Sequence, residues 1–198
     1  MSTVMDARSR MSVLGAVVMS SMAKQVSAAT DNNQESALRT LYDATGGASW
    51  TNKNGWGGTA DSSSDPCDDG WYGVTCSTSG TKKVQTLLLS DNNVKGTIPT
   101  QLGTLVEMSY IHLNGNSISG TIPTEFFSMT KLGTVTTTDD SNYYEAIRLD
   151  YNTITGTIPS EIGNLQSFYN YNDDYFGYGI NMKYNKLSGA IPSEIGLV

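Results

Sequence analysis

The stretch that decides the fold is Leu87–Pro99, which reads LLLSDNNVKGTIP. Its alternation Leu87-x-Leu89 predicts a short strand with one buried face. Three residues further on, Asn92 predicts a turn whose side-chain amide satisfies backbone groups of its own and neighbouring turns. Pro99 predicts an extended, non-helical return path. The stretch therefore predicts one coil, made of a strand, a turn and an extended return.

The same pattern occurs four times along the chain. The block Gly-Thr-Ile-Pro begins at Gly96, Gly120 and Gly156, and Gly-Ala-Ile-Pro begins at Gly189, so the second and third intervals are longer than the first. One such unit cannot bury its own apolar face, whereas stacked units bury a continuous core beneath parallel strands about 4.8 Å apart. Residues 84–198 are therefore predicted to form a solenoid of four repeats. The apolar pair and asparagine that precede each block are Leu87, Leu89 and Asn92; Ile111, Leu113 and Asn116; Ile147, Leu149 and Asn152; and Ile180, Met182 and Asn185.

This repeat resembles the plant-type leucine-rich repeat. Residues 29–83 resemble the N-terminal cap of such proteins, with a helix around Ala37–Tyr42, then Trp50, Trp56 and the segment Asp65–Cys76. The chain is similar to algal and bacterial secreted leucine-rich-repeat proteins and to receptor-like ectodomains. The resemblance implies a curved solenoid with parallel strands on its concave face, an irregular or 3-10 convex side, and a helical, disulfide-closed cap. It also implies recognition rather than catalysis, in an extracellular setting.

Residues 1–28 are predicted to be a secretory signal peptide. Arg8 and Arg10 form a positive region, residues 11–23 are an apolar stretch too short for a bilayer, and residues 26–28 offer small side chains at a cleavage site. An N-terminal anchor or a cytosolic amphipathic helix is the alternative. The segment carries a formal charge of +2, so its removal changes the net charge from −7 to −9.

Cys67 and Cys76, nine positions apart, are the two cysteines of the chain. In an oxidising compartment we expect them to form a disulfide. Two free thiols of a redox or metal-binding pair are the alternative, which fits poorly because there is no Cys-x-x-Cys and no nearby histidine. We expect the bond to hold the cap over the first strand and to cover the apolar edge at Leu87 and Leu89.

Composition argues against several classes of function. There are 12 Lys+Arg against 19 Asp+Glu and no basic block, which argues against nucleic-acid binding and favours neutral or cationic partners. No apolar run reaches the roughly 18 residues that a membrane span needs. His112 is the one histidine, no phosphate loop or dinucleotide motif occurs, and we expect neither catalytic residues nor a cofactor.

Two inserts interrupt the regular period of the repeat, near residues 133–144 and 169–177, each before a strand. Insertions in repeat proteins gather on one face, which is often the binding face. We predict that these inserts project side by side; tolerated loops with solvated charge are the alternative. Asp139, Asp140, Asp173 and Asp174 could gather around Ca²⁺, but paired aspartates in loops are usually solvated and no metal site is predicted. The tyrosines expected to bind ligand here are Tyr143, Tyr144, Tyr171 and Tyr175.

Polar and aromatic residues on and beside the predicted strands complete a composite ligand-binding site with the inserts. The alternative to a binding site is the ordinary polar surface that any solenoid carries. The strand residues assigned to the site are Tyr110, His112, Asn114, Arg148, Asp150, Tyr151, Asn181 and Lys183.

The sequence thus predicts a secreted or cell-surface, non-enzymatic recognition module for a protein, peptide or glycan. A truncated ectodomain of a receptor-like protein or kinase is the alternative. A wall-associated or ice-binding protein is a second alternative, based on the register of Thr97, Thr121 and Thr157, which Ala190 interrupts. The chain stops inside what would be another repeat, so association through an uncapped C-terminal edge is also expected.

Overall fold

The structure is a computed structural model that describes residues 33–57, 64–78, 80–134, 145–165 and 179–197. Residues 34–198 form one compact unit. The predicted signal peptide lies outside the described residues. So do residues 135–144 and 166–178, which hold the aspartates and tyrosines of the predicted inserts. No helix among the described residues is long and apolar enough to cross a membrane.

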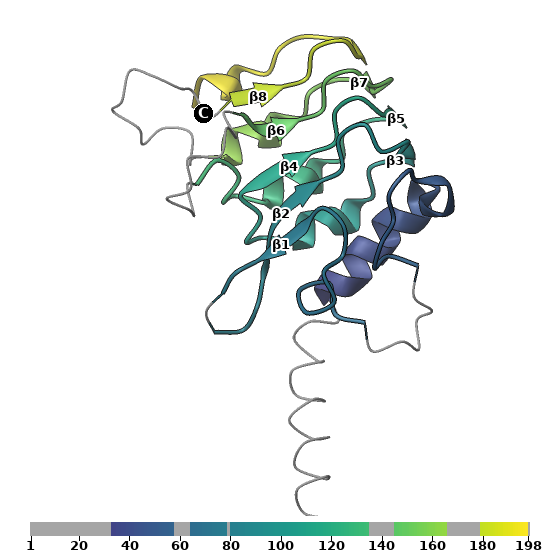
Figure 1. The fold of residues 1–198 in the computed structure, drawn as a ribbon. Coiled ribbons are helices and arrows are strands. Elements are labelled where there is room, and N and C mark those ends of the chain that lie inside the picture. Colours follow the sequence, from purple (N-terminus) through teal and green to yellow (C-terminus); the bar gives the residue numbers. More distant parts are fainter. Residues whose placement is uncertain (1–32, 58–63, 79, 135–144, 166–178, 198) are drawn as a thin grey trace, which may run out of the picture. The chain divides into compact units, whose positions relative to one another are not determined.

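A five-stranded sheet forms one face of the unit, in the order β1-β2-β4-β6-β8 (Figure 1). The last four strands are parallel, and each comes from one coil. Ile111 pairs with Leu87 on one side and with Ile147 on the other, so the first buried residue of each repeat stands in one row. This confirms the predicted solenoid. The strands are β1 (Val74–Cys76), β2 (Val84–Leu88), β4 (Tyr110–His112), β6 (Glu145–Arg148) and β8 (Gly179–Asn181).

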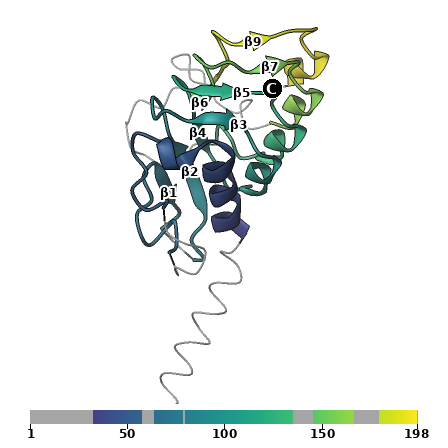
Figure 2. The same cartoon turned by 90° about the vertical axis from the view of Figure 1, so that its right-hand side faces the viewer.

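Short 3-10 helices form the opposite, convex side, as predicted (Figure 2). Pro99, Pro123 and Pro159 hold extended backbone angles directly before three of these helices, which is the return path that their fixed φ predicts. Two-stranded pairs, β3 with β5 and β7 with β9, lie at the corner that follows the main sheet. These elements are β3 (Lys95–Thr97), β5 (Ser117–Ser119), β7 (Thr155–Gly156), β9 (Lys186–Leu187), η2 (Thr100–Thr104), η3 (Thr124–Ser128), η4 (Ser160–Asn164) and η6 (Ser193–Leu197).

The recurring glycine and threonine pack against each other from coil to coil. A Cβ added at Gly120 would lie 2.9 Å from the Cγ2 methyl of Thr97, and one at Gly156 would lie 2.8 Å from that of Thr121. Gly120 also has a φ of 75°, which L side chains rarely adopt. Each threonine methyl therefore lies over the glycine of the next coil, and this packing accounts for the recurrence of both residues.

The predicted asparagine ladder is present at the turn after each strand. Asn116 Nδ2 donates hydrogen bonds to the carbonyls of Leu89 (2.8 Å) and Leu113 (2.9 Å), and its Oδ1 accepts from the backbone N–H groups of Asn92 (3.0 Å) and Val94 (2.9 Å). One side chain thus ties two successive coils together. A buried amide that forms this many bonds carries little desolvation penalty.

The other ladder residues repeat this arrangement. Asn152 donates to Leu113, and Asn185 donates to Leu149, one coil back in each case. At the first coil, Asn92 exchanges two hydrogen bonds with the backbone of Asn52 in the cap, at 2.7 and 2.9 Å. The ladder therefore continues from the repeats into the cap.

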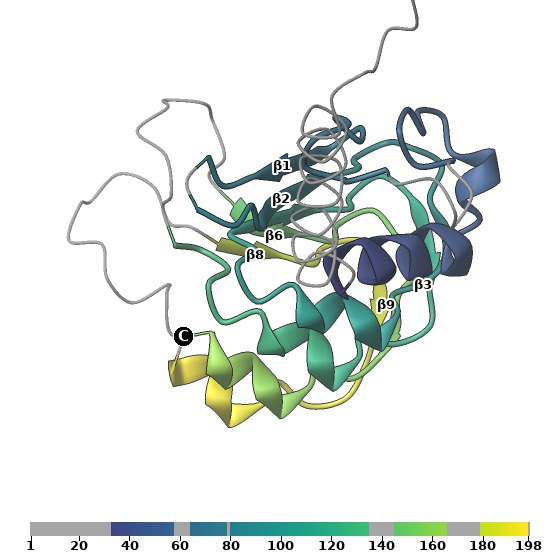
Figure 3. The ribbon, with the colours of Figure 1, turned by 90° about the horizontal axis from the view of Figure 1, so that it is seen from below.

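The cap begins with a helix over residues 33–44, which lies beside the row of 3-10 helices (Figure 3). Behind it, after η1 (Gly47–Ser49), the rings of Trp50 and Trp56 pack 4.9 Å apart, and those of Trp56 and Trp71 pack 5.0 Å apart. All three tryptophans are buried. Gly96 approaches the end of the helix so closely that a Cβ there would collide with the Ala44 carbonyl. The cap helix therefore docks directly on the first coil.

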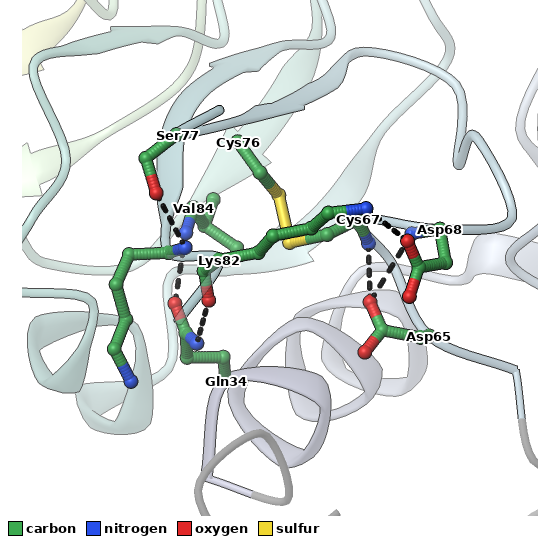
Figure 4. The surroundings of a disulfide bond; sticks show 9 residues. Gln34, Asp65, Cys67, Asp68, Cys76, Ser77, Lys82 and Val84 are labelled. Atoms are coloured by element: carbon green, nitrogen blue, oxygen red, sulfur yellow. Dashed lines mark hydrogen bonds and ion pairs between the residues drawn. A yellow bond between two sulfur atoms is a disulfide. The ribbon is translucent and has the colours of Figure 1, made fainter. Parts of the chain in front are cut away.

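The disulfide between Cys67 and Cys76 is present, with its Cα atoms 5.5 Å apart (Figure 4). Cys76 ends β1, which pairs antiparallel with β2 and places Val74 opposite Leu87. The predicted role of the bond, holding the cap over the first strand, agrees with this pairing. Gln34 adds a second link, because its side-chain amide accepts from the N–H of Val84 at 2.8 Å.

At the other end of the sheet, β8 is the edge strand. The last coil is less buried than its predecessors at equivalent positions. Ile98 and Ile122 are 5% and 3% exposed, whereas Ile191, which follows the same glycine pattern, is 72% exposed. Ile195 is 41% exposed, although its counterpart Ile162 is 1% exposed.

Candidate functional site

The open face of the main sheet carries one row of side chains that crosses all four coils. Leu88 pairs with His112, His112 with Arg148, and Arg148 with Asn181. These residues alternate with the core residues, so they point away from the core. The row changes along the sheet from an apolar residue to polar and charged ones, and its polar part lies on β4, β6 and β8.

A charged cluster is centred on Arg148 of β6. Its Nε lies 3.1 Å from Glu145 Oε2 and 3.5 Å from Asp150 Oδ1, so one guanidinium faces two carboxylates. Asn181 Nδ2 donates to the same Glu145 oxygen at 3.1 Å, which joins β8 to the cluster. The Asp150 side chain is only 3% exposed. A buried carboxylate is stabilised by a cation beside it, which Arg148 supplies to Asp150.

Two buried atoms of this cluster have ion-pair contacts without a well-oriented hydrogen bond. Among the residues that the structure describes, Arg148 Nε and Asp150 Oδ1 have no hydrogen-bond partner. Buried polar atoms are nearly always hydrogen-bonded in folded proteins. These two atoms face each other at 3.5 Å and are shielded from solvent, so the cluster meets a polar molecule through its partly exposed Arg148 and Glu145 side chains, 36% and 34% exposed.

His112 borders the cluster and is held in a fixed orientation. Its Nε2 lies 2.7 Å from the carbonyl oxygen of Glu145. Burial lowers the pKa of His112 below its ordinary value, and the Glu145 carbonyl and the nearby carboxylates oppose that shift only in part. The imidazole is therefore neutral at neutral pH and contributes shape and a hydrogen bond rather than charge.

The remaining predicted site residues differ in how far they are buried. Tyr110 is 6% exposed and belongs to the core cluster, so it adds no open aromatic surface of the kind we expected. Asn114 is also buried, and its Oδ1 accepts from Ser90 Oγ at 2.7 Å. Lys183 is exposed. The tyrosines at positions 143, 144, 171 and 175 lie outside the described residues.

Tyr151 forms a feature that the strand pattern does not reveal. Its ring stacks on that of Tyr184, with centroids 4.4 Å apart and an interplanar angle of 22°. The two residues are 57% and 67% exposed, and their φ values are 54° and 53°. Left-handed backbone at a bulky residue costs about 1–3 kcal/mol. The tyrosine pair is therefore a strained, exposed element beside the cluster.

Sequence reasoning missed several residues of this region. Glu145 was not assigned to the site, although a carboxylate three residues before Arg148 is a recognisable ion-pair signal. Asp91 and Gly115 were not assigned either, and Tyr184 was noted only as an aromatic residue that flanks the strands. These three directly precede a ladder asparagine, as Tyr151 does, and that shared position is the signal that could have found them.

No group of three or more His, Cys, Asp or Glu side chains suited to a metal ion occurs in the described parts of the chain. Residues 31–77 match the family described as leucine rich repeat N-terminal domain. Residues 83–105, 107–129 and 145–165 match the leucine rich repeat. The chain belongs to the plant-type leucine-rich-repeat proteins with an N-terminal cap.

This leucine-rich-repeat chain is similar to a probable leucine-rich repeat receptor-like protein kinase of Arabidopsis thaliana. The two are 34% identical over 90 residues, which is 44% of this chain and 8% of the kinase. The chain therefore spans a small part of that relative's length.

Several solved structures share the fold of this chain. The crystal structure of PEPR1-AtPEP1 has a TM-score of 0.62 at 22% identity, over 84% of this chain and 20% of that one. The BIR3–SERK2 complex from Arabidopsis thaliana gives 0.60 at 22% identity, over 81% and 73%. The ectodomain of the plant membrane receptor kinase GASSHO1/SCHENGEN3 from Arabidopsis thaliana, in complex with CASPARIAN STRIP INTEGRITY FACTOR 2, gives 0.55 at 28% identity, over 70% and 14%.

Proposed function

We propose that this chain is an extracellular, non-enzymatic recognition module of the receptor-ectodomain type, and that it binds a peptide on the open face of β4, β6 and β8. The observation that carries the proposal is the Arg148 cluster, which offers a partly exposed donor group, the Arg148 guanidinium, and a partly exposed acceptor group, the Glu145 carboxylate, on that face. A peptide backbone or polar side chain supplies both complementary groups. The solved GASSHO1/SCHENGEN3 ectodomain, which has the same fold, is in complex with CASPARIAN STRIP INTEGRITY FACTOR 2.

The cluster suits recognition because its groups are already in place. Glu145 and Asp150 both contact Arg148 Nε, and the bond from Asn181 holds Glu145 in turn. Side chains that are ordered before binding lose less entropy when a ligand arrives. The predicted signal peptide and the tyrosine-rich inserts support an extracellular setting and a wider contact area, and both remain part of the proposal.

The test is selection of random linear peptides displayed on phage against the secreted chain, followed by affinity measurement with synthetic copies of the selected peptides. Arg148→Gln should weaken binding about tenfold or more, since hydrogen bonds to charged groups contribute about 1.5–3 kcal/mol. Lys131→Gln is the matched control. It also removes one positive charge, but from an exposed pair with Glu107.

Thermal unfolding of both variants checks that the fold is retained. Selected peptides that bind the Arg148→Gln variant as tightly as the parent would place recognition elsewhere and end the proposal. The wall-associated and ice-binding alternatives receive no specific support from the described residues, because the threonine row has a packing role against the glycines of the next coil.

A further inference from the structure

Asp91, Gly115, Tyr151 and Tyr184 occupy the same position in four successive coils, directly before the ladder asparagine. All four have left-handed backbone, with φ values of 52°, 66°, 54° and 53°. The N–H groups of Asp91, Gly115 and Tyr151 bond to the following coil, as from Gly115 to the Asp150 carbonyl at 3.0 Å. The four residues therefore stand in line along the solenoid axis, about 4.8 Å apart. We call this line the corner row.

The stacking of the two tyrosines fixes the direction of their rings. Because Tyr184 covers one face of Tyr151 and comes from the next coil, the opposite face of Tyr151 is turned toward the preceding coil. The residue of that coil in the corner row is Gly115, which has no side chain to cover the ring. The 57% exposure of Tyr151 agrees with one open face.

Asp91 closes this space from the other side. A Cβ built on Gly115 would collide with the carboxylate of Asp91, so that carboxylate leans over the glycine, toward the open face of Tyr151. Asp91 is exposed, and no ion pair found among the described residues involves it. The glycine therefore floors a slot with a carboxylate on one wall and an aromatic face on the other.

We propose that this slot binds a cationic side chain, lysine or arginine, of a peptide ligand. The face of an aromatic ring carries negative potential, and a cation within about 6 Å of the ring centroid is attracted to it. The backbones of Asp91 and Tyr151 lie two coils apart, roughly 9–10 Å, and the Asp91 carboxylate leans into that interval over Gly115, so a cation on the open face of the ring lies beside the carboxylate. The net charge of −7 draws cations toward the whole chain.

The strained backbone of Tyr151 and Tyr184 also supports a ligand site here. Asp, Asn and Gly tolerate the left-handed region, and Asp91 and Gly115 are of that kind, whereas tyrosine is not. Observed strain of this type gathers at ligand sites. The slot extends the proposed function, because it assigns one side chain of the same peptide, yet it stands on residues that the Arg148 cluster does not include.

The test uses three blocked tripeptides, acetyl-Gly-Lys-Gly-amide, acetyl-Gly-Arg-Gly-amide and an uncharged norleucine analogue, titrated into the secreted chain. NMR signals of the Tyr151 ring should shift saturably with the two cationic probes and far less with the analogue. Added salt should weaken the cationic probes, since the site is exposed.

Asp91→Asn removes the charge without changing shape, and Tyr151→Asn removes the ring while tolerating the left-handed backbone. Each should weaken binding of the lysine probe about two- to fivefold, the range expected for an exposed cation on an aromatic face. Asp43→Asn, an exposed carboxylate in the cap helix, is the matched control for charge.

No shift of the Tyr151 signals, equal affinity for the norleucine analogue, or unchanged affinity in Asp91→Asn would overturn the assignment. A neutral oligosaccharide such as maltotriose that shifts Tyr151 where the lysine probe does not would also overturn it. The tripeptide titration and the phage selection are separate measurements. If only the slot is wrong, the tripeptides fail while Arg148→Gln still weakens binding of the selected peptides. If only the proposed function is wrong, Arg148→Gln has no effect while the tripeptides still shift the Tyr151 signals.

Discussion

The two edges of the main sheet bury their coils by different means. At the β1 edge, an antiparallel strand, a disulfide and a tryptophan cluster cover the first coil, and Leu87 and Leu89 are fully buried. At the β8 edge, Ile191 is 72% exposed and Ile195 is 41% exposed. The difference shows that the apolar side chains of a coil are covered largely by the neighbouring coils. At the first coil, the cap covers them instead, through contacts of a different kind.

The largest expected effect is the loss of the cap's aromatic core. Trp56 is 1% exposed and packs between Trp50 and Trp71, so Trp56→Ala should lower the free energy of unfolding by about 3–5 kcal/mol. Urea unfolding followed by circular dichroism measures this change. Tyr72→Ala, which removes a 38% exposed ring of the same cap, is the control and should have a much smaller effect. Similar losses in the two variants would contradict the cap's role.

Removal of the disulfide comes next. Replacing Cys67 and Cys76 together by serine should lower the free energy of unfolding by about 2–4 kcal/mol, because the open loop gains entropy in the unfolded chain. The same urea experiment measures it, and mass spectrometry of the parent after thiol alkylation verifies the bond. Two alkylated cysteines in the secreted parent would show that the β1 edge is closed without a covalent link.

A matched pair of isoleucines compares the edges directly. Ile122→Ala should cost about 2–4 kcal/mol, because Ile122 is 3% exposed in a coil with neighbours on both sides. Ile191→Ala, at the same motif position of the last coil, should change stability by less than about 1 kcal/mol. Equal costs in urea unfolding would mean that Ile191 is buried in solution, for instance by association through the β8 edge. Light scattering would detect such an association.

The smallest expected difference lies in the ladder. Asn152 is buried with three carbonyl partners, so Asn152→Ala should cost about 1–3 kcal/mol by leaving them unsatisfied. Asn185→Ala should cost less, because its bond to the Lys183 carbonyl is exposed and water can replace the amide there. Hydrogen exchange of the neighbouring amides reports the loss locally. A larger effect at Asn185 would show that the ladder does not weaken toward the edge.

The repeat pattern was sufficient to predict the solenoid and the ladder, because each depends on residue types at recurring positions, whereas the 3-10 convex side followed from the resemblance to the leucine-rich repeat. The disulfide followed from two cysteines and the expected compartment. The same reasoning was weaker on the open face, where Tyr110 is buried although its position alone suggested an aromatic surface. Burial there depends on what surrounds the strand, and the strand's own alternation does not encode that.

The candidate site shows the same limit. Arg148 and Asp150 could be assigned to one face by alternation, but the ion pair with Glu145 required coordinates to establish. The stacked pair Tyr151 and Tyr184 was harder still to predict. Its geometry depends on left-handed backbone in two coils that are distant in sequence, and no local pattern reports the direction of a ring.

The ladder bonds also show how little stability a longer repeat loses. The interval from Asn116 to Asn152 is half as long again as that from Asn92 to Asn116, yet Asn116, Asn152 and Asn185 all reach back one coil at 2.8–2.9 Å. Lengthening a loop by half costs only about 0.4 kcal/mol of chain entropy, since the penalty grows with the logarithm of length. The segment between a convex helix and the next strand is therefore a place where this scaffold can exchange sequence, in evolution or by grafting, at almost no loss of stability.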